Sequence, residues 1–438
     1  MLYWEKLLRE RPVPQMRQIL ILGGGAAGLA AAIGAAQTAG GSARVVLLDK
    51  NPRPGKKLLA TGNGRCNLDN LTAGEAGRYF TSSPRALSPL LAAIDRADLS
   101  GWWAGLGLVT RPDETGRVYP YSNQAADLTG LLLRWVEALG VCLRPGCRVE
   151  SLRQGQGGYL VQFENETGQP ETLRADGVIC ALGGSAGPQF GTDGFGPAFA
   201  GKCGGRLAPV YPCLTPLACP KDQVKGLAGL RAKAGAALMD GERVLAREQG
   251  EVQFTDYGLS GICIMQLSGL LAPGRGPKNP AVSLDLFPAL SEAELTALLA
   301  ARAELPGQTA ESFWLGLLAR PLGATLWARA GLPGGTTGGR NPAQWQKLAK
   351  LAKDWRFGPL TPCGWKQAQT TGGGLALEEL EPESFGFRGC PGLYFVGETL
   401  DCAGSCGGFN LHWAFGSGLV AGRHAARPPR PTKPKKKK

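Results

Sequence analysis

The sequence predicts an α/β protein built around a parallel sheet, and three observations support that prediction. The apolar run 18–22 leads directly into the glycine-rich segment 23–28, which is followed by a helix-length run of small residues. A second apolar run, 44–49, ends in an acid 21 positions after the last glycine of that segment. Apolar runs that end in glycines return at 176–184 and 392–397. Short buried strands that alternate with helices are typical of a doubly wound sheet.

The segment 23–28 has the G-x-G-x-x-G spacing of a nucleotide-binding turn. Gly23 permits the tight turn, Gly25 lets a pyrophosphate approach the backbone, and Gly28 lets the helix pack on the strand. The N-terminus of that helix offers free N–H groups and a positive dipole end. Asp49 stands where a carboxylate would bind ribose hydroxyls. The turn and the acid together predict a Rossmann-like domain that binds an adenine dinucleotide.

The segment between the first two strands and residue 186 continues this pattern. Apolar spacing predicts helices over 84–110 and 125–140, and a strand over 141–149. Residues 159–163 and 171–174 form a predicted hairpin across a glycine-containing turn. The chain then returns to the sheet at 176–184.

The character of the sequence changes between about 187 and 360. Residues 205–290 hold short apolar runs separated by Pro and Gly, which indicates a β-rich segment. Residues 291–357 carry helical patterns, and Ser291 with Glu294 forms a predicted capping box. A buried strand and a helix from Asn410 to about Ala425 follow, so 187–360 is predicted to be inserted into the nucleotide-binding domain.

These boundaries predict six segments. They are an N-terminal extension (1–16), the first part of the nucleotide-binding domain (17–186), a β-rich inserted domain (187–290), a helical inserted domain (291–360), the C-terminal part of the nucleotide-binding domain (361–426) and a basic disordered tail (427–438).

The loop after the strand at 392–397 indicates which dinucleotide is bound. Glu398 and Asp401 lie just beyond the strand, where acids suit the hydroxyls of a ribityl chain. Gly407 and Gly408 open the final helix, and the N-terminal dipole of that helix would face the pyrimidine end of a flavin, where negative charge accumulates on reduction. NAD needs neither feature, so the sequence predicts non-covalently bound FAD.

Several longer motifs resemble one known family. The segment 55–67 (GKKLLATGNGRCN) is similar to the signature loop of the HI0933-like flavoproteins, also called the BaiN-type or aminoacetone-oxidase-like NAD(P)/FAD-dependent oxidoreductases. Similar family motifs stand at 114–122, at 181–194, at 254–261 and at 397–410. The resemblance spans about 17 to 425.

The resemblance implies an FAD-binding domain of the two-dinucleotide-binding flavoprotein type, interrupted by a β-barrel-like domain and a small helical domain. It also implies that 62–67 lies along the isoalloxazine ring and that backbone groups of Val149 lie at the adenine. Two positions depart from the family pattern: Asp256 replaces a His, and Ile262 replaces the usual Pro. A different proton donor or substrate would follow if that loop lines the substrate side.

The residues predicted to contact FAD share positions in these loops and strand ends. They are Gly23, Gly25, Ala26, Ala27, Gly28, Asp49, Lys50, Lys57, Gly62, Asn63, Gly64, Arg65, Asn67, Val149, Ala181, Gly183, Gly397, Glu398, Asp401, Gly407, Gly408, Asn410 and Leu411.

No catalytic residue is identified from the sequence, which offers three candidates. Cys66 is a redox candidate, but a cysteine is by default a small buried hydrophobe. His412 lies just inside the final helix, where it could equally cap or pack. Asp256 is a candidate only through its departure from the family motif. With two histidines and no paired C-x-x-C, no metal site is predicted.

Composition constrains partners and compartment. The net charge of +13 invites a nucleic-acid interpretation, but eight of those charges lie between Arg423 and Lys438 with no acid among them, which leaves +5 for the rest. A solvated tail is favoured over weak attachment to nucleic acid or an anionic membrane.

The run 19–36 imitates a signal peptide, yet its glycine spacing favours the nucleotide-binding turn. Twelve scattered cysteines favour reduced thiols in the cytoplasm, and no membrane span is predicted.

These observations predict an FAD-dependent oxidoreductase that passes hydride through flavin N5. NAD(P)H is the electron donor that the family resemblance implies, although no second G-x-G-x-x-G appears. The substrate is predicted to be a small molecule, through either enone reduction or amine oxidation. An RNA-acting or RNA-bound flavoprotein and a non-catalytic redox sensor stay open as alternatives, as does the oligomeric state.

Overall fold

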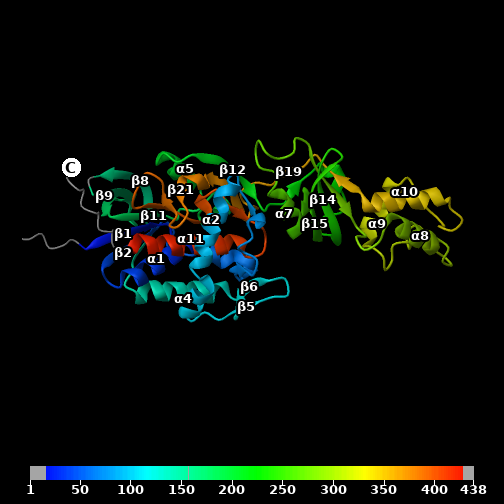
Figure 1. Cartoon of the computed structure of the whole chain (residues 1–438). Coiled ribbons are helices and arrows are strands. Elements are labelled where there is room, and N and C mark those ends of the chain that lie inside the picture. Colours follow the sequence, from blue (N-terminus) through cyan, green and yellow to red (C-terminus); the bar gives the residue numbers. More distant parts are fainter. Residues whose placement is uncertain (1–15, 156, 428–438) are drawn as a thin grey trace, which may run out of the picture. The chain divides into compact units, whose positions relative to one another are not determined.

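The computed structural model describes residues 16–155 and 157–427. The predicted extension before Met16 and the predicted tail beyond Arg427 lie outside the described residues. The chain forms two compact units (Figure 1). The first holds the residues up to Ala208 and those from Gly373 onward, and the second is Pro209–Gly372. Strands β12 (Leu207–Cys213) and β20 (Thr370–Leu375) contain the two points at which the chain passes between the units.

The first unit is organised by a seven-stranded sheet. In spatial order its strands are β21 (Leu380–Glu381), β22 (Gly386–Phe387), β23 (Leu393–Phe395), β11 (Gly177–Cys180), β1 (Arg17–Leu22), β2 (Ala43–Asp49) and β7 (Cys142–Pro145). The five strands from β23 to β7 run parallel, whereas β21 and β22 form an antiparallel edge. This arrangement confirms the predicted α/β fold with a Rossmann-type sheet.

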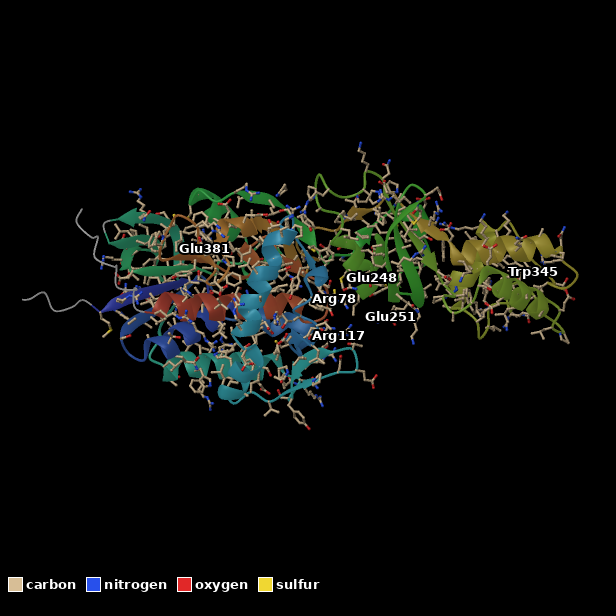
Figure 2. The ribbon with its side chains drawn as sticks, in the orientation of Figure 1. Arg78, Arg117, Glu248, Glu251, Trp345 and Glu381 are labelled. Atoms are coloured by element: carbon tan, nitrogen blue, oxygen red, sulfur yellow. The ribbon has the colours of Figure 1, made fainter. Side chains whose placement is uncertain are left out.

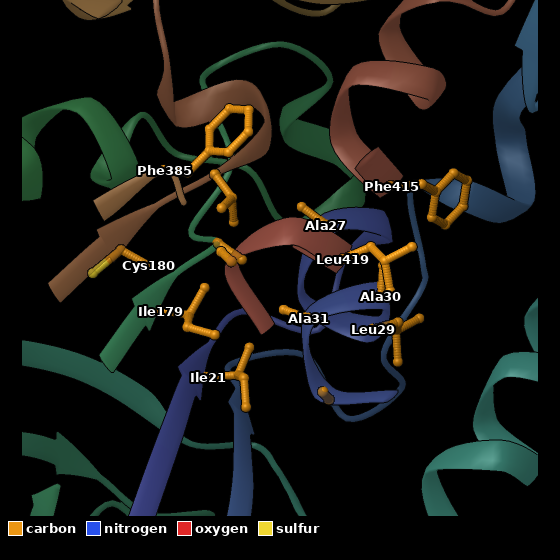
Figure 3. Packing of buried hydrophobic residues seen from close by; sticks show 14 of the residues in the cluster. Ile21, Ala27, Leu29, Ala30, Ala31, Ile179, Cys180, Phe385, Phe415 and Leu419 are labelled. Carbon is orange, nitrogen blue, oxygen red and sulfur yellow. The ribbon is translucent and has the colours of Figure 1, made fainter. Parts of the chain in front are cut away.

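Two helices that meet through small residues lie in the core of this unit (Figure 3). Helix α1 (Ala26–Ala39) follows β1, and helix α11 (Phe409–Ala426) packs along it. The apolar side chains of β1 and β11, such as Ile21 and Ile179, are fully buried in the same core. Burial of these strand residues and of α1 on both sides explains the continuous apolar runs in the sequence.

The other elements of the first unit are smaller sheets and helices. The helices are α2 (Pro84–Arg96), α3 (Leu99–Gly105), α4 (Ala125–Ala138) and α5 (Phe195–Lys202). The strands are β8 (Arg148–Gly155), β9 (Gly158–Glu164) and β10 (Pro170–Ala175) in one sheet, β3 (Asp69–Asn70), β5 (Thr110–Pro112) and β6 (Arg117–Pro120) in a second, and β4 (Tyr79–Phe80) with β24 (Ala403–Gly404) in a third.

Two predicted elements of this unit are wrong in extent. The helix predicted over 84–110 is broken at Asp98, which adopts the left-handed conformation (φ 50°), caps α3 through its side chain and separates that helix from α2. The strand predicted over 141–149 is divided between two sheets. Its break is held by hydrogen bonds from Gly146 N to Asn51 O, in the loop after β2, and from Cys147 N to the carbonyl oxygen of Asp49, the last residue of β2. Apolar spacing cannot show either break, because the first depends on the polar side chain of Asp98 and the second on backbone contacts with a distant segment.

The second unit contains another seven-stranded sheet and a group of helices. In spatial order the strands are β18 (Trp355–Phe357), β17 (Pro280–Asp285), β14 (Arg231–Asp240), β15 (Arg243–Phe254), β16 (Gly258–Ser260), β13 (Leu217–Ala218) and β19 (Thr361–Pro362). The helices are α6 (Lys221–Val224), α7 (Ile262–Ser268), α8 (Glu292–Ala303), α9 (Arg320–Arg329) and α10 (Pro342–Lys353). The predicted capping box at the start of α8 is present, with Ser291 and Glu294 bonded reciprocally.

Two findings on the described residues concern membranes and metals. No helix in the ranges 16–155 and 157–427 is long and apolar enough to cross a membrane. Within the same ranges, no group of three or more His, Cys, Asp or Glu side chains is arranged to hold a metal ion. All twelve cysteines are free thiols.

Candidate cofactor site

Three glycine-bearing loops follow neighbouring strands of the main sheet. The loop 23–28 follows β1, the loop that contains Gly183 follows β11, and the loop 397–408 follows β23. Because β23, β11 and β1 are adjacent and parallel, the three loops meet at one edge of the sheet. That edge is where open α/β sheets bind their ligands.

The glycines of the first loop differ in the space around them. A Cβ on Gly23 would stand 2.3 Å from the carbonyl oxygen of Ala181, and one on Gly28 would stand 1.7 Å from the carbonyl oxygen of Gly23. A Cβ on Gly25 would meet no atom within 4 Å. Two glycines therefore serve close packing of the chain on itself, whereas Gly25 lies beside open space at the start of α1.

The N-terminus of α1 is available for an anion. Gly25 is its N-cap, no side chain caps it, and its first turn holds no acid. The first N–H groups of a helix lack intrahelical partners and favour negative charge. The open space at Gly25 and these N–H groups fit the pyrophosphate of a dinucleotide.

Asp49 is buried and already bonded to its own loops. Its Oδ2 accepts a hydrogen bond from Gly24 N at 2.5 Å, and its Oδ1 accepts one from Asn51 N at 2.6 Å. Burial raises the pKa of the Asp49 carboxyl above its usual value, while the backbone donors of Asn51 and Gly24 oppose that rise. Asp49 therefore fixes the loop after β2 against the glycine turn, and its contact with ribose stays a prediction.

Two lysines predicted to contact FAD are paired with acids. Lys50 Nζ lies 2.6 Å from Asp193 Oδ2, and Lys57 Nζ lies 2.7 Å from Glu398 Oε2. The second pair joins two predicted cofactor residues that are far apart in the sequence, one after β2 and one after β23. Sequence reasoning missed Asp193, although it lies in the glycine-rich motif at 181–194.

The loop after β23 contains a buried acceptor. Gly397 N donates to Ser417 Oγ at 3.0 Å, which fixes the loop to α11. The Asp401 side chain is fully buried, and its Oδ2 accepts from Ser82 N at 2.8 Å. Asp401 Oδ1 has no hydrogen-bond partner among the described residues. A buried carboxylate oxygen without a donor fits the hydroxyl chemistry of a ribityl chain.

The turn Gly407-Gly408 precedes α11 and requires glycine. Both residues have positive φ, 122° and 103°. A Cβ on Gly408 would stand 2.1 Å from the carbonyl oxygen of Asp69. Asn70 Nδ2 donates to Gly407 O at 2.7 Å, and the Asn67 amide, oriented to satisfy both of its ends, accepts from Gly408 N at 3.1 Å.

The side-chain amides of two predicted contacts bond the segment that leads into α11. Asn67 does so through Gly408, and Asn410 bonds both the N and the O of Gly404, each at 2.8 Å. Any contact of these two residues with FAD would therefore involve their backbone groups. Leu411 lies in the first turn of the same helix.

The loop that the family resemblance assigns to the isoalloxazine is tightly coiled. Gly62, Asn63 and Gly64 have φ of 57°, 55° and 83°. Arg65 is exposed, and its guanidinium carbon lies 5.3 Å from the ring centroid of Tyr119.

The remaining predicted contacts lie on α1, on β8 and in the segment after β11. Ala26 and Ala27 begin α1, and Val149 is buried in β8. Ala181 and Gly183 follow β11, and Gly183 O accepts a hydrogen bond from Thr399 at 3.2 Å.

The three catalytic candidates have different surroundings. Cys66 is fully buried, and burial raises the pKa of its thiol to about 11, so the sulfur is protonated at neutral pH. His412 Nδ1 lies 2.7 Å from Asp69 Oδ1, a pairing that the sequence did not reveal. Asp256 is exposed in the turn between β15 and β16, within the second unit.

Comparisons with known proteins identify the family and the fold of the chain. The chain matches the family model described as HI0933-like protein Rossmann domain over residues 17–424. The 3-dehydro-bile acid Δ4,6-reductase of Clostridium scindens is 36% identical over 94% of this chain and 100% of its own length. The ribosomal RNA dihydrouridine synthase of Escherichia coli is 29% identical over 91% of this chain and 95% of its own.

A solved structure shares the fold. The 3-ketosteroid-Δ4-(5α)-dehydrogenase of Rhodococcus jostii matches with a TM-score of 0.50 and 17% identity, over 95% of this chain and 99% of that chain. The sheet, its glycine turn and this likeness define a Rossmann-type flavoprotein fold. The chain belongs to the HI0933-like family, a family of FAD-binding oxidoreductases.

Proposed function

We propose that this protein is an FAD-dependent reductase that saturates a carbon–carbon double bond conjugated to a carbonyl in a small molecule, with NAD(P)H as electron donor. The observation that carries the proposal is that three glycine-bearing loops meet at adjacent strand ends. Of the three glycines of the G-x-G-x-x-G turn, only Gly25 has open space beside it. That geometry suits a bound dinucleotide, and bound FAD supplies hydride chemistry through its N5.

The chain's own residues would bind and orient the cofactor. The N–H groups of the first turn of α1 would hold the pyrophosphate. Asp401 Oδ1 would accept a hydrogen bond from a hydroxyl group of the ribityl chain. The uncapped N-terminus of α11 would stabilise negative charge at the pyrimidine end of the reduced flavin.

The names of two relatives support the choice of reaction. A bile acid Δ4,6-reductase and a dihydrouridine synthase both saturate a double bond that is conjugated to a carbonyl. The carbonyl withdraws electrons, so the β carbon accepts hydride and the α carbon then takes a proton. We therefore favour enone reduction over the amine oxidation that the sequence left open. The twelve free thiols support a cytoplasmic location.

Anaerobic mixing of the FAD-loaded protein with NADH and with NADPH tests the electron donor. Bleaching of the flavin absorbance by either nucleotide is expected, followed by reoxidation when a 3-oxo-Δ4 steroid is added. If amines bleach the flavin and enones fail to reoxidise it, the protein is an oxidase and the proposal is wrong.

A second candidate function is reduction of uridine in RNA. The 29% identity with the Escherichia coli synthase and the basic residues after Arg427 favour it. Ribosomal RNA transcripts would be incubated with the reduced enzyme and assayed for dihydrouridine, with a variant that ends at residue 427 in parallel. Dihydrouridine formation by the full chain, and its loss in the variant that lacks residues 428–438, would support RNA rather than a small molecule as the substrate.

A further inference from the structure

The small sheet of β3, β5 and β6 turns one face toward the Gly407-Gly408 turn. Asn70 and Arg117 stand directly opposite each other in the β3–β6 register, so their side chains lie on the same face. Asn70 Nδ2 donates to Gly407 O, and Arg117 Nε lies 3.7 Å from the position of a Cβ on Gly407. The Arg117 guanidinium therefore lies against the turn that opens α11.

Arg117 forms no ion pair with an acidic side chain in the part of the chain that the structure describes. The residue is half-buried, and among the described residues its side chain makes no hydrogen bond or salt bridge. Asp113 lies near enough for the Arg117 charge to lower its pKa, but that carboxylate accepts hydrogen bonds from Thr115 and from the Arg117 backbone N. Partial burial of a guanidinium without a carboxylate partner costs free energy, and binding of an anion to the guanidinium would offset that cost.

Two further arginines lie nearby, one over an aromatic ring of β6 and one over the first aromatic ring of α11. Tyr119 lies two residues after Arg117 on the same face of β6, and the Arg65 guanidinium lies 5.3 Å from its ring centroid. The Arg78 guanidinium lies 5.9 Å from the ring centroid of Phe409, the first residue of α11. Figure 2 shows Arg78 and Arg117 in the same part of the first unit. We call Arg65, Arg78 and Arg117 the arginine cluster.

Of the acids near this cluster, one is bonded to a histidine, and the other pairs with Arg78, which leaves Arg65 and Arg117 without an acidic partner among the described residues. Asp69 Oδ1 bonds His412, and Glu75 forms an exposed pair with Arg78. The cluster therefore keeps a surplus of positive charge beside the turn that, under the proposed function, faces the flavin.

We infer that the arginine cluster, with Arg117 at its centre, binds a carboxylate on the substrate, so that the preferred substrates are anionic enones. This inference rests on the proposed function. A planar guanidinium offers paired N–H donors that match a carboxylate, which a lysine does not. The cluster would hold the carboxylate and so fix where the conjugated double bond lies against the flavin.

The test compares a 3-oxo-Δ4 steroid acid with its methyl ester on the FAD-loaded protein. Dissociation constants would come from changes in the flavin absorbance under anaerobic conditions, and KM and kcat from steady-state reduction. The wild type is expected to bind the acid more tightly than the ester. Arg117→Gln is expected to weaken binding of the acid about ten-fold or more and to leave the ester within about two-fold.

Three controls keep the result interpretable. Arg153→Gln removes the same charge from an exposed position on β8. This variant is expected to change neither the dissociation constant of the acid nor that of the ester. Arg117→Lys should bind the acid more tightly than Arg117→Gln but less tightly than the wild type, because lysine keeps the charge and lacks the paired N–H donors of a guanidinium. Arg65→Gln removes a different positive charge from the arginine cluster and serves as the second variant if Arg117→Gln does not fold.

Two outcomes would overturn the inference. One is equal loss of affinity for acid and ester. The other is a change confined to the FAD dissociation constant or the flavin reduction potential, which would place Arg117 against the cofactor. Turnover of neither compound, with tight binding of the acid that depends on Arg117, would instead contradict the proposed function and leave the carboxylate site standing.

Discussion

Gly418 of α11 lies against the carbonyl oxygen of Ala27 in α1, where a Cβ on Gly418 would stand 2.1 Å from that oxygen. One turn further along, Gly422 stands in the same relation to Ala31, with a corresponding distance of 2.2 Å. The two helices can approach only because these positions lack side chains. Their contact brings together the two helices whose N-termini are predicted to face the pyrophosphate and the pyrimidine end of the flavin.

Gly418→Ala should therefore destabilise the first unit by about 1–3 kcal/mol, because the helices must separate to admit the methyl group. Calorimetry should show a lower Tm, by about 2–4 °C for each kcal/mol. Gly130→Ala is the matched control, since a Cβ there meets no atom within 4 Å inside helix α4. That change should leave the Tm equal or higher; a fall as large as that of Gly418→Ala would refute the packing argument.

Gly25→Ala and Gly28→Ala should separate cofactor binding from folding. Gly25 has φ of −79° and open space, so alanine should change the stability of the FAD-free protein by less than about 1 kcal/mol. FAD affinity should fall at least about ten-fold, because the methyl group occupies the space that the pyrophosphate needs. Gly28→Ala should cost about 1–3 kcal/mol without FAD, since its Cβ would clash with Gly23 O. Fluorescence titration with FAD and thermal melts of the apoprotein distinguish the two, and unchanged FAD affinity in Gly25→Ala would contradict this site.

The ion pair between Lys57 and Glu398 should couple the loops after β2 and β23. The side chains are 28% and 20% exposed, so a double-mutant cycle with Lys57→Met and Glu398→Gln should give a coupling of about 0.5–1.5 kcal/mol in the apoprotein. The pair Arg96–Glu383 has side chains that are 54% and 74% exposed and should give a coupling near zero. Equal couplings for the two pairs would show that burial does not decide their strength.

Cys66 should be unreactive at neutral pH. Its folded-state pKa of about 11 lies above that of an unfolded cysteine, near 8.5, because burial disfavours the thiolate. The fold therefore gains stability from the protonated thiol below the unfolded pKa and loses it as pH rises through about 11. Peptide mapping after iodoacetamide treatment at pH 7.5 should leave Cys66 unlabelled in the native protein and labelled in urea, while half-buried Cys142 labels faster. Rapid native labelling of Cys66 would reopen its redox role.

The sequence alone was sufficient for the parallel sheet, because strands buried on both faces must be continuously apolar. The runs that became β1, β2 and β11 show this directly. The fingerprint at 23–28 was equally legible, since its spacing follows from steric limits on a tight turn. Local signals also sufficed for the capping box at Ser291, where both partners lie within four residues.

What only the tertiary structure decided is how distant residues pair. The salt bridge from Lys57 to Glu398, the bond from Asp69 to His412 and the approach of Arg117 to Gly407 all join segments separated by hundreds of positions. A motif indicates that a charged side chain is present, but its partner is set by the register of strands and the packing of helices. For that reason the sequence assigned Lys57 and Glu398 separately to the cofactor and assigned Arg117 no role. The fold determines which charges are neutralised within the chain and which remain available to a ligand.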